Sequence, residues 1–245
     1  SIALEDVLPK LGYPFVVSTE SPHAGILIAS RLPIRSSFTL IPGRVLIAQI
    51  SYFTLTNAYL KLVSKEEELP GRMLQDEQLI KHLKTLTDKN VLVGDLNAIE
   101  NPAYDIIYPS RMYRDKNYNL YLDRTNSLPT ALRDIGYKDL YRQHYPNESQ
   151  NNFTTHPTNA FSGFQARVDY IYTSRQIDPA LCSMQLIESK HSDHSTLVAD
   201  INLFETPIDE MNSMINWMIH SQSINVIRQI HGVDVEIDSD DDLMI

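Results

Sequence analysis

A glycine, an aspartate and an asparagine end an apolar run at residues 91–97, Val-Leu-Val-Gly-Asp-Leu-Asn. Asp95 and Asn97 are two residues apart, so their side chains point to the same side if the chain stays extended there. A carboxylate and a carboxamide at a strand end could hold a water molecule and a phosphate oxygen. Gly-Asp-Leu-Asn is also ordinary turn chemistry, so the motif alone leaves both interpretations open.

Two later motifs carry further polar groups beside apolar runs. Asp169 lies inside the strand-like stretch at residues 167–174, where an ionised side chain needs a partner or a cavity. A salt bridge to Arg167 is the structural alternative. Asp193 and His194 then precede another apolar run. Such residues bind hard cations and transfer protons, although they also occur as plain loop polarity.

The elements that would position these residues follow from the apolar pattern. Strand-like runs occupy residues 15–19, 24–30, 44–50, 51–60, 90–95, 167–174 and 195–204, and a helical period runs through residues 65–86. Strands with interspersed helices predict a layered α/β (α+β) domain. From residue 206 the pattern becomes helical and then acidic, which places a domain boundary near residue 205, with a helical extension and acidic tail at 206–245.

Composition and charge restrict the class of protein. The 245 residues are 42% hydrophobic, enough for one full core, and include one cysteine, Cys182, so no intramolecular disulfide forms. We therefore expect an intracellular, nuclear protein without a membrane partner. The net charge of −10 is concentrated in residues 201–245, which carry −8, whereas residues 1–200 carry −2. The acidity is thus compatible with a polyanionic substrate, and the tail is an expected contact for a protein partner.

In their order along the chain, Gly-Asp-Leu-Asn, Arg-Val-Asp-Tyr and Ser-Asp-His resemble the endonuclease/exonuclease/phosphatase superfamily, the DNase I-like fold. Residues 24–34 and the pair of runs ending in Asn-Ala-Tyr at residues 57–59 are also similar to that family. The segment 139–174 resembles exonuclease III-type abasic-site nucleases and the endonuclease domains of non-LTR retrotransposons. The resemblance implies a four-layer α-β-β-α sandwich over residues 1–205.

The resemblance also implies a role for each matching residue. Asp95 would position or deprotonate the attacking water, and Asn97 would contact the phosphate. His194 would lie on the scissile phosphate, with its ring oriented by Asp169. The remaining matches are Tyr59, which would face the phosphate, and Asp193, which would lie near a divalent metal, Mg²⁺ or Mn²⁺.

A segment rich in tyrosine and basic residues separates the motifs, at residues 104–124. Aromatic rings can stack on bases and cations can neutralise phosphates, so we expect a substrate-binding loop there, with a solvated loop as the alternative. The basic residues concerned are Arg111, Arg114, Lys116 and Arg124.

The sequence departs from the family at its start. Two opening strands, the first ending in Asn and the second in Gln-Glu, have no counterpart here, and Glu20 follows a different strand. The glutamate is a principal metal ligand of the family, so we expect weak or absent activity from this chain. It is either a fragment of a complete nuclease or a degenerate family member.

These observations favour divalent-metal-dependent hydrolysis of DNA phosphodiesters, by an endonuclease or exonuclease. Inositol-polyphosphate phosphatases usually have Trp-Cys-Asp-Arg where this chain has Arg-Val-Asp-Tyr, which counts against that class. The alternatives are a catalytically dead DNase I-like binding module, or a phosphatase or phosphodiesterase of the same superfamily that acts on a different substrate.

Overall fold

The structure is a computed structural model that describes residues 4–19, 25–63, 66–107, 127–146, 165–187, 192 and 194–203. The chain divides into two units, Ser1–Leu203 and Phe204–Ile245, and the second lies outside the described residues. The helical extension and acidic tail expected there, with their boundary near residue 205, therefore stay predictions.

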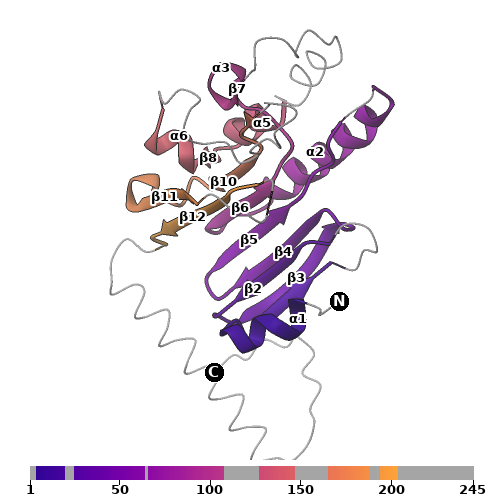
Figure 1. Cartoon of the computed structure of the whole chain (residues 1–245). Coiled ribbons are helices and arrows are strands. Elements are labelled where there is room, and N and C mark those ends of the chain that lie inside the picture. Colours follow the sequence, from indigo (N-terminus) through magenta and orange to yellow (C-terminus); the bar gives the residue numbers. More distant parts are fainter. Residues whose placement is uncertain are drawn as a thin grey trace, which may run out of the picture. The chain divides into compact units, whose positions relative to one another are not determined.

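A six-stranded sheet forms the centre of the first unit, with the strand order β3-β4-β5-β6-β10-β8 (Figure 1). All neighbours are antiparallel except β5 and β6, which run parallel and are joined through helix α2. The strands are β3 (Ile34–Ile41), β4 (Val45–Ile50), β5 (Phe53–Ala58), β6 (Asn90–Asp95), β8 (Lys138–Asp139) and β10 (Asp169–Thr173), and helix α2 spans Leu69–Leu83.

One face of this sheet packs against the helices α2 and α5 (Ser127–Asp134). The period of two along each strand places alternate residues in this layer, for example Leu92 of β6 and Tyr170 of β10. They meet Leu79 and Leu83 of α2 and Leu132 of α5, and all of these side chains are buried.

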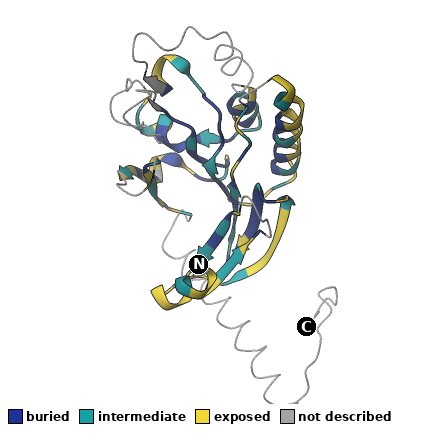
Figure 2. Cartoon of the chain, turned by 45° about the vertical axis from the view of Figure 1, so that its right-hand side comes forward, coloured by how far each residue is buried: buried dark blue, intermediate teal, exposed yellow. Residues whose placement is uncertain are grey.

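The other face of the sheet packs against two smaller antiparallel sheets. One consists of β1 (Phe15–Ser18) and β2 (Leu27–Ser30), and the other of β11 (Cys182–Ile187) and β12 (Thr196–Ile201). Ile28 of β2 packs with Ala48 of β4, and Met184 of β11 packs with Ile171 of β10. Buried residues therefore lie on both faces of the central sheet, and the residues coloured as exposed gather along the outer elements (Figure 2).

The remaining elements are short. They are α1 (Leu4–Val7), η1 (Leu8–Leu11), η2 (Glu66–Glu68), α3 (Pro102–Asp105), α6 (Leu140–His144), η3 (Pro179–Leu181) and the paired strands β7 (Ile106–Ile107) and β9 (Gln165–Ala166). Among the described residues, no helix has the length and apolar character needed to cross a membrane. The layered α/β architecture expected from the sequence is confirmed.

Candidate active site

Two aspartates from the neighbouring strands β6 and β10 lie directly opposite each other, where these central strands end and begin. Asp95 is the last residue of β6 and Asp169 is the first of β10, and the register pairs them. Their neighbours Gly94 and Tyr170 belong to the helix-covered face, so both carboxylates point to the opposite face, toward the second β layer. The site thus lies at the rim between the two β layers.

His194 reaches the same place from the second β layer, because it lies two residues before β12. Its Nδ1 is 2.7 Å from Asp169 Oδ2, so the ring N–H donates to the carboxylate. Arg167, the alternative partner of Asp169, instead pairs with Asp105 and Asp139. The hydrogen bond expected between Asp169 and His194 is therefore present.

The carboxyl group of Asp95 is the most perturbed acid in this cluster. Burial, followed by the negative charge of Asp169, raises its pKa from 3.8 to about 6. The hydrogen bond from Asn97 N–H and the charges of His194 and Arg72 act in the opposite direction. A carboxylate with a pKa near 6 is ionised at neutral pH and can still accept a proton from water.

The turn after β6 explains why the motif contains Gly94 and Asn97. Gly94 has φ of 129°, and a Cβ there would lie 2.0 Å from the carbonyl oxygen of Ala58, so only glycine fits between β5 and β6. Asn97 has φ of 43°, in the left-handed region that asparagine tolerates better than most residues. The sequence Gly-Asp-Leu-Asn therefore forms a turn and also presents the polar side chains of the candidate site, so both interpretations of the motif apply.

Asn97 fixes the orientation of Asp95. Its backbone N–H donates to Asp95 Oδ1 (2.8 Å), and its side-chain Nδ2 donates to Asp95 Oδ2 (3.0 Å) and to the carbonyl oxygen of Leu60 (3.0 Å). The contact with phosphate that the family resemblance implied for Asn97 stays a prediction.

Tyr59 lies beside Asp95 in the sheet. The parallel pairing of β5 with β6 continues one step past Ala58, because Leu60 N–H donates to the carbonyl oxygen of Asp95. Tyr59 is 40% exposed, and the guanidinium of Arg44 lies 4.9 Å from the centre of its ring. A row of polar side chains, Arg44, Tyr59, Asp95 and Asp169, thus crosses the ends of four strands.

Asp95, Asp169 and His194 could together hold a metal ion, since each offers one ligand atom and these atoms lie within 4.8 Å of one another. The carboxylates suit Mg²⁺ or Mn²⁺, which prefer oxygen ligands, whereas imidazole is a more common ligand of Zn²⁺, Cu²⁺ and Fe²⁺. Asp193, the metal ligand expected from the sequence, lies outside the described residues. The basic residues expected to bind substrate also lie outside them: Arg111, Arg114, Lys116 and Arg124.

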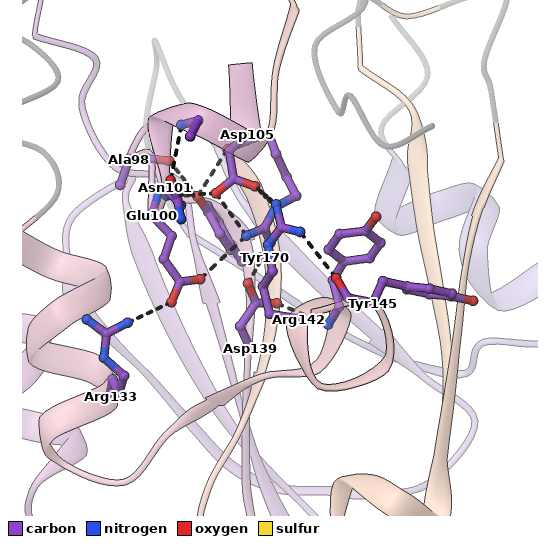
Figure 3. A network of polar contacts seen from close by, with 12 residues as sticks. Ala98, Glu100, Asn101, Asp105, Arg133, Asp139, Arg142, Tyr145 and Tyr170 are labelled. Atoms are coloured by element: carbon purple, nitrogen blue, oxygen red, sulfur yellow. Dashed lines mark hydrogen bonds and ion pairs between the residues drawn. The ribbon is translucent and has the colours of Figure 1, made fainter. Parts of the chain in front are cut away.

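Two groups of buried charges beneath the site were not found from the sequence. The first is Arg72 with Asp76, at i and i+4 on the buried face of α2. The second joins Glu100, Asp105 and Asp139 to arginines, including Arg142, below the loop that follows β6 (Figure 3). For the second group, Arg167 beside an apolar run was the available signal, because a charge buried there requires a partner, whereas Arg72 lies in a mostly polar helix.

The second group holds the loop after Asn97. Arg167 is 3% exposed, and its Nε donates to Asp105 Oδ1 at 2.9 Å. Tyr170, which lies in the same network in Figure 3, donates from its hydroxyl to the carbonyl oxygen of Ala98 (2.8 Å) and accepts from the backbone N–H of Glu100 (3.2 Å). Burial, followed by the charge of Asp139, raises the pKa of Glu100 to about 7.

Comparison with solved structures identifies proteins of the same fold. A 3′ phosphatase, NExo, from Neisseria, solved with a product DNA hairpin, has a TM-score of 0.66 at 18% identity, over 81% of this chain and 82% of its own. A 3′-5′ exonuclease (NExo) from Neisseria meningitidis gives 0.67 at 18%, over 81% and 83%. An AP endonuclease from Archaeoglobus fulgidus gives 0.64 at 21% identity, over 81% and 82%.

These likenesses establish the DNase I-like fold. No curated protein matches the chain. The model of the Endonuclease/Exonuclease/phosphatase family, however, matches residues 3–194, which include Tyr59, Asp95, Asp169 and His194. On this match the chain belongs to the endonuclease/exonuclease/phosphatase family.

Proposed function

We propose that this protein hydrolyses phosphodiester bonds in DNA with the help of a divalent cation, Mg²⁺ or Mn²⁺. Family membership supports a nuclease or phosphatase activity. The observation that carries the proposal is the convergence of Asp95, Asp169 and His194 at the rim between two β layers, with their ligand atoms within 4.8 Å.

The roles of the residues follow from their contacts. Asp95, with its pKa raised to about 6, accepts the proton of the attacking water at neutral pH. Asp169 holds the ring of His194 through Nδ1, and the ring in its protonated, imidazolium form donates from Nε2 to an oxygen of the phosphate. Tyr59, partly exposed beside Asp95, contacts the same phosphate through its hydroxyl.

The carboxylate of Asp169 would hold the cation, and that of Asp95, the proposed base, lies directly opposite it. Two like charges on directly opposed residues repel each other, so this pair fits a site that binds positive charge. When bound, a divalent cation neutralises negative charge on the phosphate and polarises its oxygens.

DNA is the proposed substrate for two reasons. One solved relative is described with a product DNA hairpin, and another is an AP endonuclease. The body of this chain, residues 1–200, also has little net negative charge to repel a polyanion. A duplex with an abasic site and supercoiled plasmid are therefore the first substrates to test for phosphodiester hydrolysis, and a 3′-phosphorylated hairpin tests for hydrolysis of a phosphomonoester.

Cleavage of these three substrates should be measured in millimolar Mg²⁺ or Mn²⁺, and again with EDTA. We expect slow cleavage that EDTA abolishes and that the Asp95→Asn variant lacks. Asp200→Asn is the matched control, because this exposed carboxylate of β12 accepts a hydrogen bond from Ser183 of β11 and has no role in the proposed chemistry. Binding of DNA without cleavage of any of the three would support a binding module and contradict the proposal.

A further inference from the structure

Arg72 is a buried cation that has no part in the chemistry proposed for the site. It lies on α2 and is 1% exposed, although arginine is rarely buried so fully unless its charge is matched. Helix α2 covers the face of the central sheet opposite to the carboxylate of Asp95. Arg72 therefore approaches the active-site turn from behind, where it cannot touch a substrate at the rim.

The guanidinium of Arg72 binds backbone carbonyls from the segments that follow two strands. Its Nη2 donates to Leu96 O (2.7 Å), and its Nη1 donates to Asn97 O (3.0 Å) and to Lys61 O (2.8 Å). The planar fork has five N–H donors in fixed directions, which suits three carbonyls at once. The segments after β5 and β6, which carry Tyr59 and Asp95, are thus joined through one side chain.

The carbonyls that Arg72 binds lie in the turn that orients Asp95. The peptide groups of Leu96 and Asn97 flank the residue with positive φ, and Asn97 in turn donates two hydrogen bonds to the Asp95 carboxylate. A shift of these peptides would move both donors. A displacement of the Arg72 guanidinium would therefore displace Asn97, and with it the carboxylate of Asp95.

Asp76 keeps the guanidinium in place. Its Oδ1 accepts from Arg72 Nε at 2.7 Å, one helical turn further along α2. Removing Arg72 alone would leave a buried carboxylate without its cation, which destabilises a protein independently of any role in catalysis. A useful test therefore removes both charges together.

We propose that Arg72 is a positioning residue that sets the orientation of the Asp95 carboxylate through the carbonyl groups of Leu96 and Asn97. The effect on reaction rate rests on the proposed function, whereas the effect on the turn does not. Arg72 should act on the chemical step and leave the affinity for DNA unchanged, because it lies behind the turn.

The test uses the full-length chain with the double substitution Arg72→Met and Asp76→Leu, which replaces the buried pair by apolar groups of similar size. We expect the variant to fold and kcat for the most rapidly cleaved DNA substrate to fall at least about tenfold, as in losses of groups that orient catalytic ligands. KM should stay within about twofold, because no substrate contact changes.

Amide hydrogen exchange provides a readout that needs no activity. The Asn97 N–H should exchange at least about tenfold faster in the double variant, while Leu92 N–H in the centre of β6 keeps its rate. Ser174→Ala is the matched control, since Ser174 Oγ accepts from Asn90 N–H at the other end of β6. It should lower the melting temperature without changing kcat or the exchange of Asn97.

Arg72→Lys tests the same idea without removing the charge. A single ammonium cannot reproduce the planar fork that reaches three carbonyls and Asp76, so kcat should again fall and Asn97 exchange should again rise. Wild-type exchange at Asn97 in either folded variant would overturn the proposal, even in a chain with no measurable hydrolysis. If the wild type is active, an unchanged kcat in either variant would overturn it and leave the proposed function intact.

Discussion

The pairing of Asp95 with Asp169 lowers the stability of the sheet, but it supplies the two carboxylates that the proposed hydrolysis uses. Like charges on directly opposed residues of adjacent strands destabilise a sheet. Burial, and after it this repulsion, raises the pKa of Asp95. The pair persists because β6 and β10 are held by apolar contacts along the rest of their length, such as those of Leu92 and Tyr170.

The pKa of Asp95 predicts the pH dependence of hydrolysis. The proposed base must be ionised to accept a proton, so kcat/KM should fall as pH decreases through about 6. The measurement is kcat/KM from pH 5 to pH 9 at saturating Mg²⁺. A rate that is constant down to pH 5 would exclude Asp95 as the base.

Asp169→Asn should separate catalysis from stability. The neutral amide removes the repulsion with Asp95 and weakens the hold on the His194 ring, so activity should fall about 10- to 100-fold while the melting temperature stays the same or rises. Parallel nicking assays and thermal melts would measure this. A large fall in melting temperature would instead assign Asp169 a structural role.

At the scale of elements, the close approach of β5 to β6 depends on Gly94. The substitution Gly94→Ala would place a methyl group 2.0 Å from the carbonyl oxygen of Ala58 and force a side chain to adopt a φ of 129°. We expect a loss of about 3 kcal/mol or more in the free energy of unfolding, measured by urea denaturation.

Gly71→Ala is the natural control for this prediction. Gly71 lies in α2, and among the described residues nothing lies within 4 Å of its added Cβ, so alanine should stabilise the protein by about 0.5–1 kcal/mol. An equal effect of the two substitutions would show that the contact with Ala58 does not restrict the strands.

Glu100 predicts a pH-dependent contribution to stability from the loop after β6. Its pKa is about 7 in the folded protein, against 4.5 for an unperturbed glutamate, so the folded state binds more protons than the unfolded state between these values. Its contribution to stability therefore decreases as pH rises from about 4.5 to 7. The cost above pH 7 is on the order of 1–3 kcal/mol, after allowance for partial exposure and for its coupling to Asp139.

Glu100→Gln should remove this cost, because glutamine carries no titrating charge beside Asp139. The difference in melting temperature between variant and wild type should favour the variant more at pH 8 than at pH 5. A difference that is independent of pH would contradict the raised pKa.

The sequence predicted elements where burial dictates the residue pattern. The strands β4, β6 and β10 are mainly apolar runs, β5 alternates between apolar and polar residues, and α2 follows a helical period, so each was expected. The strand β3 was missed because five consecutive residues from Arg35 to Thr39 are exposed and mostly polar, without the alternation of a half-buried strand. Short elements such as α6 and β8 hold too few residues to show a period.

For the site, the motifs were sufficient to bring Asp95, Asp169 and His194 together, because each adjoins a strand. Arg72 was not predictable in the same way. The apolar residues Met73 and Leu74 next to it are more than half exposed, whereas Arg72 itself is buried. Among the described residues, Asp76 is its one side-chain partner, at an i+4 spacing that exposed helix pairs share, and its other partners are backbone carbonyls, which carry no signal in a sequence.

At the scale of the whole molecule, residues 206–245 should be dispensable for the fold of the first unit. The buried residues of the three core clusters lie between Ile26 and Met184. Leu203 packs beside the cluster of β11 and β12, and its carbonyl oxygen accepts from Lys89. A chain ending at residue 205 should melt within about 3 °C of the full chain, a change below about 1 kcal/mol. Loss of a cooperative transition would show that the segment belongs to the core.

The strand β3 has a further consequence, for the association of two copies of the protein at high concentration. It is the last strand of the central sheet, no second strand pairs with its outer edge within the described residues, and its exposed residues face solvent on both sides. We expect two copies at high concentration to pair β3 with β3 in antiparallel fashion, which would use the long edge of each; a monomer at all concentrations in analytical ultracentrifugation would contradict this. Because the opposite end of the central sheet is the two-residue strand β8, this sheet offers no second edge of comparable length among the described residues.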